Sequence, residues 1–176
     1  MAFRKRKIAA KTPEELDLME AAGRIVGLAL TEVRAAAAPG KTTLDLDRVA
    51  ETVIRDHGAV PTFLGYNGFP ASICSSVNDV VVHGIPDTET VLQEGDLVSI
   101  DCGATLNGWV GDSAWSFGVG ELPEDVDKLL AFEYALCPDG TMVRTARRMF
   151  CAGFSVSAAA TATISMPPKA KATTSR

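Results

Sequence analysis

The sequence predicts an α+β fold, in which two helices precede a set of hairpin-connected strands. Apolar residues recur at helical spacing in two segments within residues 12–58, and short β-prone segments separated by Pro and Gly follow them. An Asn-Gly pair, the strongest short signal for a two-residue hairpin, joins the last two of these segments. This order favours helices segregated from an antiparallel sheet.

The first helix is predicted to begin after Thr12. Thr12, Pro13 and Glu15 have the positions of an N-cap, a first helical residue and the returning half of a capping box. Pro39-Gly40 ends the segment. The expected buried stripe consists of Leu16, Met19, Gly23, Val26, Leu30 and Val33.

The second helix is expected to begin near Thr42 or Thr43 and to stop at His57-Gly58. We interpret His57 as structural, because an imidazolium at a helix end complements the helix dipole. The residues expected to be buried are Leu46, Val49, Val53 and Ile54. The predicted strands cover residues 73–76, 80–82, 97–101 and 109–117.

The Asn-Gly turn predicts where two acidic residues lie. If Leu106 faces Trp109, then Asp101 lies opposite Ala114, and Asp112 becomes its diagonal neighbour, about 7–8 Å away at the backbone. Two carboxylates this close repel each other unless they share a proton or bind cations, and a pair of divalent ions about 3.5–4 Å apart fits such a hairpin. The alternative is two solvated aspartates on an exposed strand face.

The sequence around these carboxylates favours the cation. Residues 91–100 lead an apolar strand into Asp101, which indicates a partly buried carboxylate. No Lys or Arg lies between Arg55 and Lys128, so a nearby salt bridge has no candidate in this part of the sequence.

A histidine and a loop are further candidates for a site. His83 follows an apolar segment and precedes Gly84, as residues that face a cleft often do, although an ordinary histidine bonded to the backbone is the alternative. Residues 65–70 form an aromatic, glycine-rich loop with Phe63 and Cys74 on either side, which either walls an apolar pocket or packs as an ordinary loop. The loop has neither GxGxxG nor a P-loop lysine, so phosphate binding is not supported.

Composition limits the class of protein. The chain has 176 residues, of which 47% are hydrophobic, enough for one substantial core or two small ones. Its net charge of −5 argues against nucleic-acid sequence recognition. The basic N-terminal tail, residues 1–11, lacks the apolar region of a signal peptide. The four cysteines have no CxxC spacing, so we expect reduced thiols and a cytoplasmic location.

The composition changes near residue 130. The charge balance is −9 over residues 1–130 and +4 over residues 131–176, which predicts a domain over 12–130 and a divergent, poorly ordered tail over 131–176. Residues 149–166 are uncharged but consist mostly of Ala, Ser, Thr and Gly, so we expect no membrane span.

Three motifs, in order, resemble the N-terminal half of the type I methionine aminopeptidases (peptidase family M24). They are residues 63–70 (FLGYNGFP), residues 78–86 (NDVVVHGIP), and Asp101 followed by Gly108 and Gly111-Asp112. The resemblance implies half of a pita-bread (creatinase/aminopeptidase-like) fold. It also implies two divalent ions (cobalt, manganese, iron or zinc) and metal-activated water that removes the initiator methionine from nascent polypeptide N-termini at the ribosome.

The resemblance also implies roles for seven residues. Asp101 and Asp112 would be metal ligands, with Asp112 bridging both ions. His83 would be catalytic, by stabilising the tetrahedral intermediate or steering the amine. The residues expected to bind the methionine side chain and substrate are Phe63, Tyr66, Phe69, Cys74 and His83.

The chain departs from the family in its second half. The family completes its metal site with a histidine and two glutamates, whereas this chain has no histidine after His83 and only Glu133 after Glu124. We therefore expect weak metal binding and little hydrolysis by the chain alone. The alternatives are a truncated or frame-shifted product and a pseudoenzyme that binds peptide N-termini without cleavage. The missing half is also expected to leave one apolar sheet face uncovered.

Overall fold

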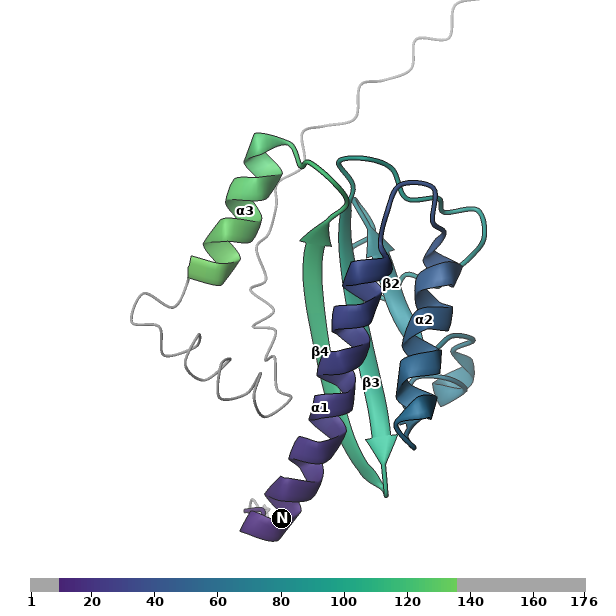
Figure 1. Cartoon of the computed structure of the whole chain (residues 1–176), viewed down its shortest axis with the longest axis vertical. Helices are drawn as coiled ribbons and strands as arrows, with labels where there is room; N and C mark the ends of the chain where they lie inside the picture. The colour runs from purple at the N-terminus through teal and green to yellow at the C-terminus, as the bar shows by residue number, and fades with distance from the viewer. Residues whose placement is uncertain (1–9, 136–176) are drawn as a thin grey trace, which may run out of the picture.

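The computed structural model describes residues 10–135 and confirms the predicted α+β class (Figure 1). An antiparallel sheet is covered on one face by two helices, and a third helix lies beside it. Nearly all of the predicted N-terminal tail (residues 1–11) and of the predicted divergent tail (residues 131–176) lies outside the described residues. The elements are α1 (Pro13–Ala36), α2 (Thr43–Asp56), β1 (Val60–Pro61), η1 (Tyr66–Gly68), β2 (Ile73–Val77), β3 (Leu97–Leu106), β4 (Trp109–Gly118) and α3 (Glu124–Ala135).

Helix α1 begins with the predicted capping box. The Thr12 hydroxyl accepts from the backbone N–H of Glu15 at 3.2 Å, and the Glu15 carboxylate accepts from the N–H of Thr12 at 2.9 Å. The predicted stripe is wrong at its start, because Leu16 is 53% exposed. The first turns of α1 project beyond the strands, where no sheet covers them (Figure 1). The buried residues are Ala22, Gly23, Ile25, Val26, Ala29, Leu30 and Val33.

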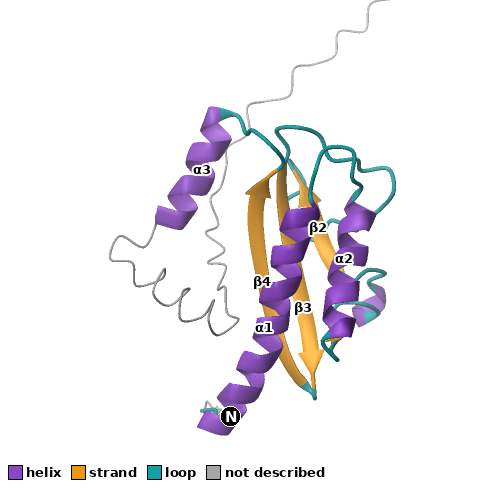
Figure 2. Cartoon of the chain, in the orientation of Figure 1, coloured by secondary structure: helices purple, strands orange, loops and turns teal. Residues whose placement is uncertain are grey.

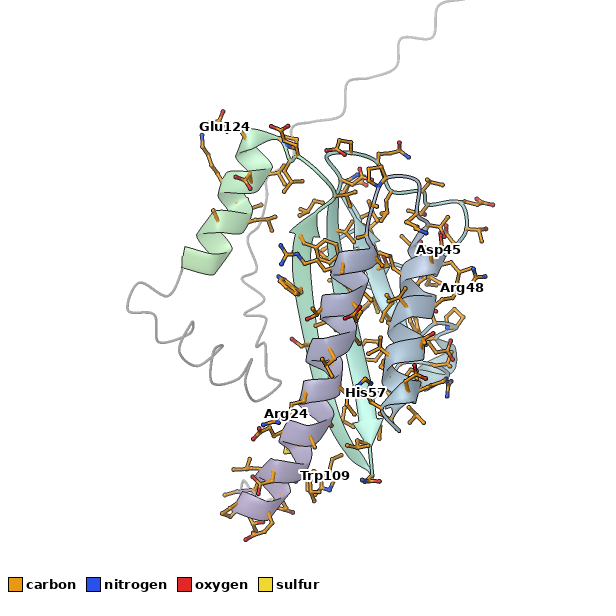
Figure 3. All side chains as sticks on the ribbon, in the orientation of Figure 1. Arg24, Asp45, Arg48, His57, Trp109 and Glu124 are labelled. Carbon is orange, nitrogen blue, oxygen red and sulfur yellow. The ribbon has the colours of Figure 1, made fainter. Side chains whose placement is uncertain are left out.

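Helix α2 begins at Thr43 behind a second capping box, formed by Thr42 and Asp45. Its core face differs from the prediction, because it includes a buried aspartate. Oδ1 of Asp47 accepts from the backbone N–H of Ser72 at 2.8 Å and of Ile73 at 3.0 Å, which fastens α2 to the start of β2. Leu46 and Ile54 are buried as predicted, and Val49 and Val53 are partly buried. His57 is exposed at the end of α2 (Figure 3).

Strand β3 is the centre of the sheet. Strand β4 pairs with its whole length, from Leu97 opposite Gly118 to Leu106 opposite Trp109. On the other edge, β2 pairs with residues 98–102 of β3 and β1 with residues 104–105. The long hairpin therefore provides most of the surface on which the rest of the domain is assembled.

The two faces of β3 have different surroundings. Val98, Ile100, Cys102 and Ala104 are fully buried against α1 and α2, which both lie on this side of the sheet (Figure 2). Burial of each larger side chain contributes about 1.5–3 kcal/mol. The alternate residues, such as Ser99, point to the other face. Most side chains on that face are small or polar, so the expectation that it is an apolar face is wrong. It carries the two aspartates, over which a partly aromatic cavity opens.

The predicted strand over residues 80–82 is wrong. Val80, Val81 and Val82 form an exposed loop after β2, with Val81 86% exposed. Asn78 has φ 54°, and its side-chain amide bonds to Asp96 and to the backbone of Leu97, so the chain turns out of the sheet there.

Three elements, β1, η1 and α3, were not predicted. Strand β1 is too short for an alternating pattern to be visible. Helix α3 carries Glu124, Asp125 and Asp127 in its first turn, which complements the helix dipole. Within residues 10–135, no helix combines the length and apolar character that a membrane crossing requires.

Candidate functional site

The hairpin brings Asp101 and Asp112 together. Asn107 (φ 50°) and Gly108 (φ 82°) form the predicted turn with positive φ at both positions. Asp101 pairs with Ala114, and Asp112 pairs with Gly103, so the two carboxylates are diagonal neighbours on one face. The predicted register is confirmed.

The two carboxylates share an unfavourable electrostatic environment. Burial, followed by the charge of Asp112 and the hydrogen bond between the two side chains, raises the pKa of Asp101 to about 6, although His83 opposes this. Burial also raises the pKa of Asp112. Among the described residues, neither carboxylate forms a salt bridge. The pair can be relieved by sharing a proton or by binding a cation.

A cavity of about 720 Å³ opens over these carboxylates. It contains all seven residues that the sequence analysis singled out for the site, drawn from β2, β3, β4 and two loops. The loop of residues 65–70, predicted as a possible pocket wall, also contributes Asn67, Gly68 and Pro70. Thr62 and Ile85 were not predicted to line a pocket. The lining residues are Thr62, Phe63, Tyr66, Asn67, Gly68, Phe69, Pro70, Cys74, His83, Ile85, Asp101 and Asp112.

His83 reaches the cavity from a loop and not from a strand end as predicted. It is exposed, with φ 58°, a conformation that histidine tolerates better than most residues. The next residue, Gly84, accepts a hydrogen bond from the backbone N–H of Ser75 at 2.9 Å and donates to the Ser76 hydroxyl at 3.2 Å. A Cβ at Gly84 would overlap the Ser75 carbonyl oxygen. Gly84 therefore holds His83 close to β2.

Cys74 forms part of the apolar wall. It pairs with Asp101 across β2 and β3 and is 7% exposed. Burial, with smaller contributions from Asp101 and Asp112, raises the pKa of the Cys74 thiol to about 11. The thiol is therefore protonated at neutral pH and packs as a small apolar group, not as a nucleophile. Cys74 and Cys102 are both free, as expected; Cys137 and Cys151 lie outside the described residues.

The site fits a divalent cation only in part. Carboxylate oxygens are ligands that divalent ions accept, and the two aspartates face the same space. Within residues 10–135, however, no group of three or more His, Cys, Asp or Glu side chains is placed to hold a metal ion. In this part of the chain, the two aspartates could therefore offer no more than part of a coordination sphere.

Comparison with known proteins agrees with this geometry. Residues 17–141 match metallopeptidase family M24. The chain belongs to this family. It is 59% identical over 127 residues to methionine aminopeptidase 1 of Mycobacterium tuberculosis (strain CDC 1551 / Oshkosh), an alignment covering 72% of this chain and 47% of the relative. Methionine aminopeptidase 1 of Bacillus subtilis (strain 168) is 53% identical over 123 residues, or 70% of this chain and 49% of the relative.

Solved structures give the same relationship. The crystal structure of methionine aminopeptidase from Thermotoga maritima matches with a TM-score of 0.72 and 39% identity, covering 76% of this chain and 54% of that one. The M24 chain thus has half of the pita-bread fold and spans about half the length of the curated relatives it matches.

Proposed function

We propose that this chain contributes half of a metalloaminopeptidase site, which removes methionine from the N-termini of nascent polypeptides in the cytoplasm. The observation that carries the proposal is the pair of carboxylates, Asp101 and Asp112, at the base of a cavity with aromatic walls. Asp101 and Asp112 serve as metal ligands. Cobalt, manganese, iron and zinc all accept this type of ligand.

The residues of the cavity have different proposed roles in substrate binding and catalysis. When bound, two divalent ions lower the pKa of a water molecule and polarise the scissile carbonyl. Phe63, Phe69 and Cys74 pack against the methionine thioether, which interacts well with aromatic edges and sulfur. The exposed side chain of Tyr66 closes the same wall at the mouth. His83 lies at the rim, where its ring N–H can donate to the substrate carbonyl or orient the amine.

Full activity requires ligands beyond those in residues 10–135. Two carboxylates alone leave a divalent ion mostly coordinated by water, so metal affinity is lower than for a closed protein site. We therefore propose that the chain alone binds metal weakly and hydrolyses methionyl peptides slowly, and that the remaining ligands come from a region equivalent to the rest of its relatives.

A metal titration combined with hydrolysis of a Met-Ala-Ser peptide tests this function. We expect metal binding by the wild-type chain to weaken at least tenfold in Asp112→Asn, because removal of one of two charged ligands costs more than 1.4 kcal/mol. Any hydrolysis should fall with it. The exposed Asp17→Asn is the matched control. Equal metal affinity in wild type and Asp112→Asn would contradict the proposal.

A second function, binding of peptide N-termini without cleavage, is favoured by a difference between the cavity and the metal-ligand set. The apolar cavity is formed within the described residues, whereas the ligand set is not completed there. A chain with this arrangement binds peptide N-termini without cleaving them. Binding of Met-Ala-Ser that persists in EDTA and in Asp101→Ala would support this function, and loss of binding under either condition would exclude it.

A further inference from the structure

Two residues that line the cavity, Thr62 and Phe63, lie against a glycine of β3 that the sequence did not single out, Gly103. Gly103 lies on the same face of β3 as Asp101, and it pairs with Asp112 on β4. Gly103 is about forty residues from Phe63 in the sequence, so the closeness of these two residues is visible only in the three-dimensional structure. The glycine thus lies beside both carboxylates and beneath the apolar wall.

The ring of Phe63 occupies the space that a side chain at position 103 would need. A Cβ placed on Gly103 would lie 2.8 Å from Cε1 of Phe63 and 3.2 Å from Cζ, and 3.1 Å from Cβ of Thr62. Distances under 3 Å are not tolerated between such atoms, so one of these neighbours must move.

Thr62 is the less able to move. Its backbone N–H donates to the Gly103 carbonyl oxygen at 2.9 Å, and its hydroxyl lies 2.8 Å from the hydroxyl of Thr105. These bonds continue the pairing of β1 with β3 and fix the chain just before Phe63. A side chain at position 103 would therefore be accommodated by displacement of the Phe63 ring, which lines the cavity.

We infer that Gly103 is a specificity-determining residue: its lack of a side chain lets the Phe63 ring pack closely against β3 and so sets the depth of the cavity beside the two carboxylates. This inference rests on the proposed function, because it takes the cavity to bind the side chain of an N-terminal residue. The residue at position 103 then determines whether the cavity accepts a long, linear apolar side chain of the substrate. Binding of a short side chain does not depend on this residue.

Peptide binding to the full chain in EDTA tests the inference. The probes are Met-Ala-Ser and Ala-Ala-Ser, compared by calorimetry. Burial of the longer side chain should make the methionyl peptide bind about tenfold more tightly to wild type. In Gly103→Ala this preference should fall to about twofold or less, with the affinity for Ala-Ala-Ser unchanged. A preference retained at its wild-type value in Gly103→Ala would overturn the inference.

Two further variants separate a local effect from a general one. Gly118→Ala is the matched control, because its Cβ would also overlap a side chain, that of Leu122, on the same sheet face but outside the cavity. It should leave the preference unchanged. In Gly103→Ala/Phe63→Leu the smaller side chain at position 63 should restore the preference to about fivefold or more. A double variant no better than Gly103→Ala would count against the role of Phe63.

Nuclear magnetic resonance on the wild-type chain gives an independent reading. A ring packed against Gly103 should give Overhauser contacts between the Hα protons of Gly103 and the ring protons of Phe63. Absence of these contacts would overturn the inference even if Gly103→Ala fails to fold. If the contacts are present but neither peptide binds, the proposed function fails while the position of the ring on Gly103 stands.

Discussion

The two faces of strand β3 differ in what their residues do for the protein. On the helix side, Ile100 and its alternate neighbours are fully excluded from solvent and pack into the core. On the other side, Asp101 has a raised pKa and Gly103 leaves space for a loop. Because adjacent residues of a strand point to opposite faces, one β-strand packs one set of side chains into the core and presents Asp101 to the cavity on its other face.

The largest expected effect is on the helix side. Ile100→Ala should lower the free energy of unfolding by about 2–5 kcal/mol, since it removes a fully buried side chain and leaves a cavity. Its neighbour Ser99 faces the other way, with its hydroxyl 2.8 Å from that of Ser116. Ser99→Ala should cost about 1 kcal/mol. Urea denaturation measures both, and equal losses would remove the distinction between the faces.

A close approach of helix and strand gives the next effect. A Cβ on Gly111 would lie 2.6 Å from both Cα and N of Gly23, where β4 meets α1. Gly111→Ala should therefore destabilise the chain by about 1–3 kcal/mol, because the backbone of α1 has to shift. Val110 is exposed on the opposite face, so Val110→Ala should change stability by about 0.5 kcal/mol or less. Thermal unfolding of both variants checks this, and a stable Gly111→Ala would show that α1 does not need to pack so closely.

The smallest effect, with the opposite sign, is expected at Asp101 in EDTA. A carboxyl whose folded pKa is about 6, above its ordinary 3.8, binds more protons in the folded chain than in the unfolded one between these pH values. Stability is therefore lost as pH rises from about 4 through 6. At pH 7, Asp101→Asn should stabilise the metal-free chain by about 1 kcal/mol, a value reduced for partial solvent screening.

The same substitution should behave differently when metal is present. Asp101→Asn removes a proposed ligand, so saturating manganese should stabilise this variant less than it stabilises wild type. Thermal unfolding at pH 5 and pH 7, in EDTA and with manganese, provides all four comparisons. Exposed Asp17→Asn serves as control. A wild-type chain in EDTA that is more stable at pH 7 than at pH 5, by an amount lost in Asp101→Asn, would reverse the sign and refute the argument.

The sequence was most informative where structure is set locally. The Asn107-Gly108 turn defines the register of the long hairpin, and the Thr12 cap defines the start of α1. Local pattern misled at Val81, because β-branched residues form a strand only where a partner strand is available.

Contacts between distant residues could not be predicted. Asp47 is buried because its partners, the N–H groups of Ser72 and Ile73 at the start of β2, are 25 and 26 residues away in the sequence. Likewise, nothing in the sequence around Gly103 shows that Phe63 lies over it. The pairing of the two carboxylates could be predicted from the sequence, because one short turn sets the register between their strands. The depth of the cavity could not, because it depends on two separate segments, those of Phe63 and Gly103.

The two-residue turn at Asn107-Gly108 also imposes a parity rule on the hairpin. One added residue at its tip, if the pairing then resumed, would turn every side chain of β4 through to the other side of the sheet. Asp112 would enter the packed layer beneath α1, and Gly111 would take its place beside Asp101. An insertion of two residues, in contrast, leaves each side chain of β4 on its present face of the sheet. If the pairing resumes, evolution or design can therefore lengthen this tip only by an even number of residues without moving core side chains onto the face of the site.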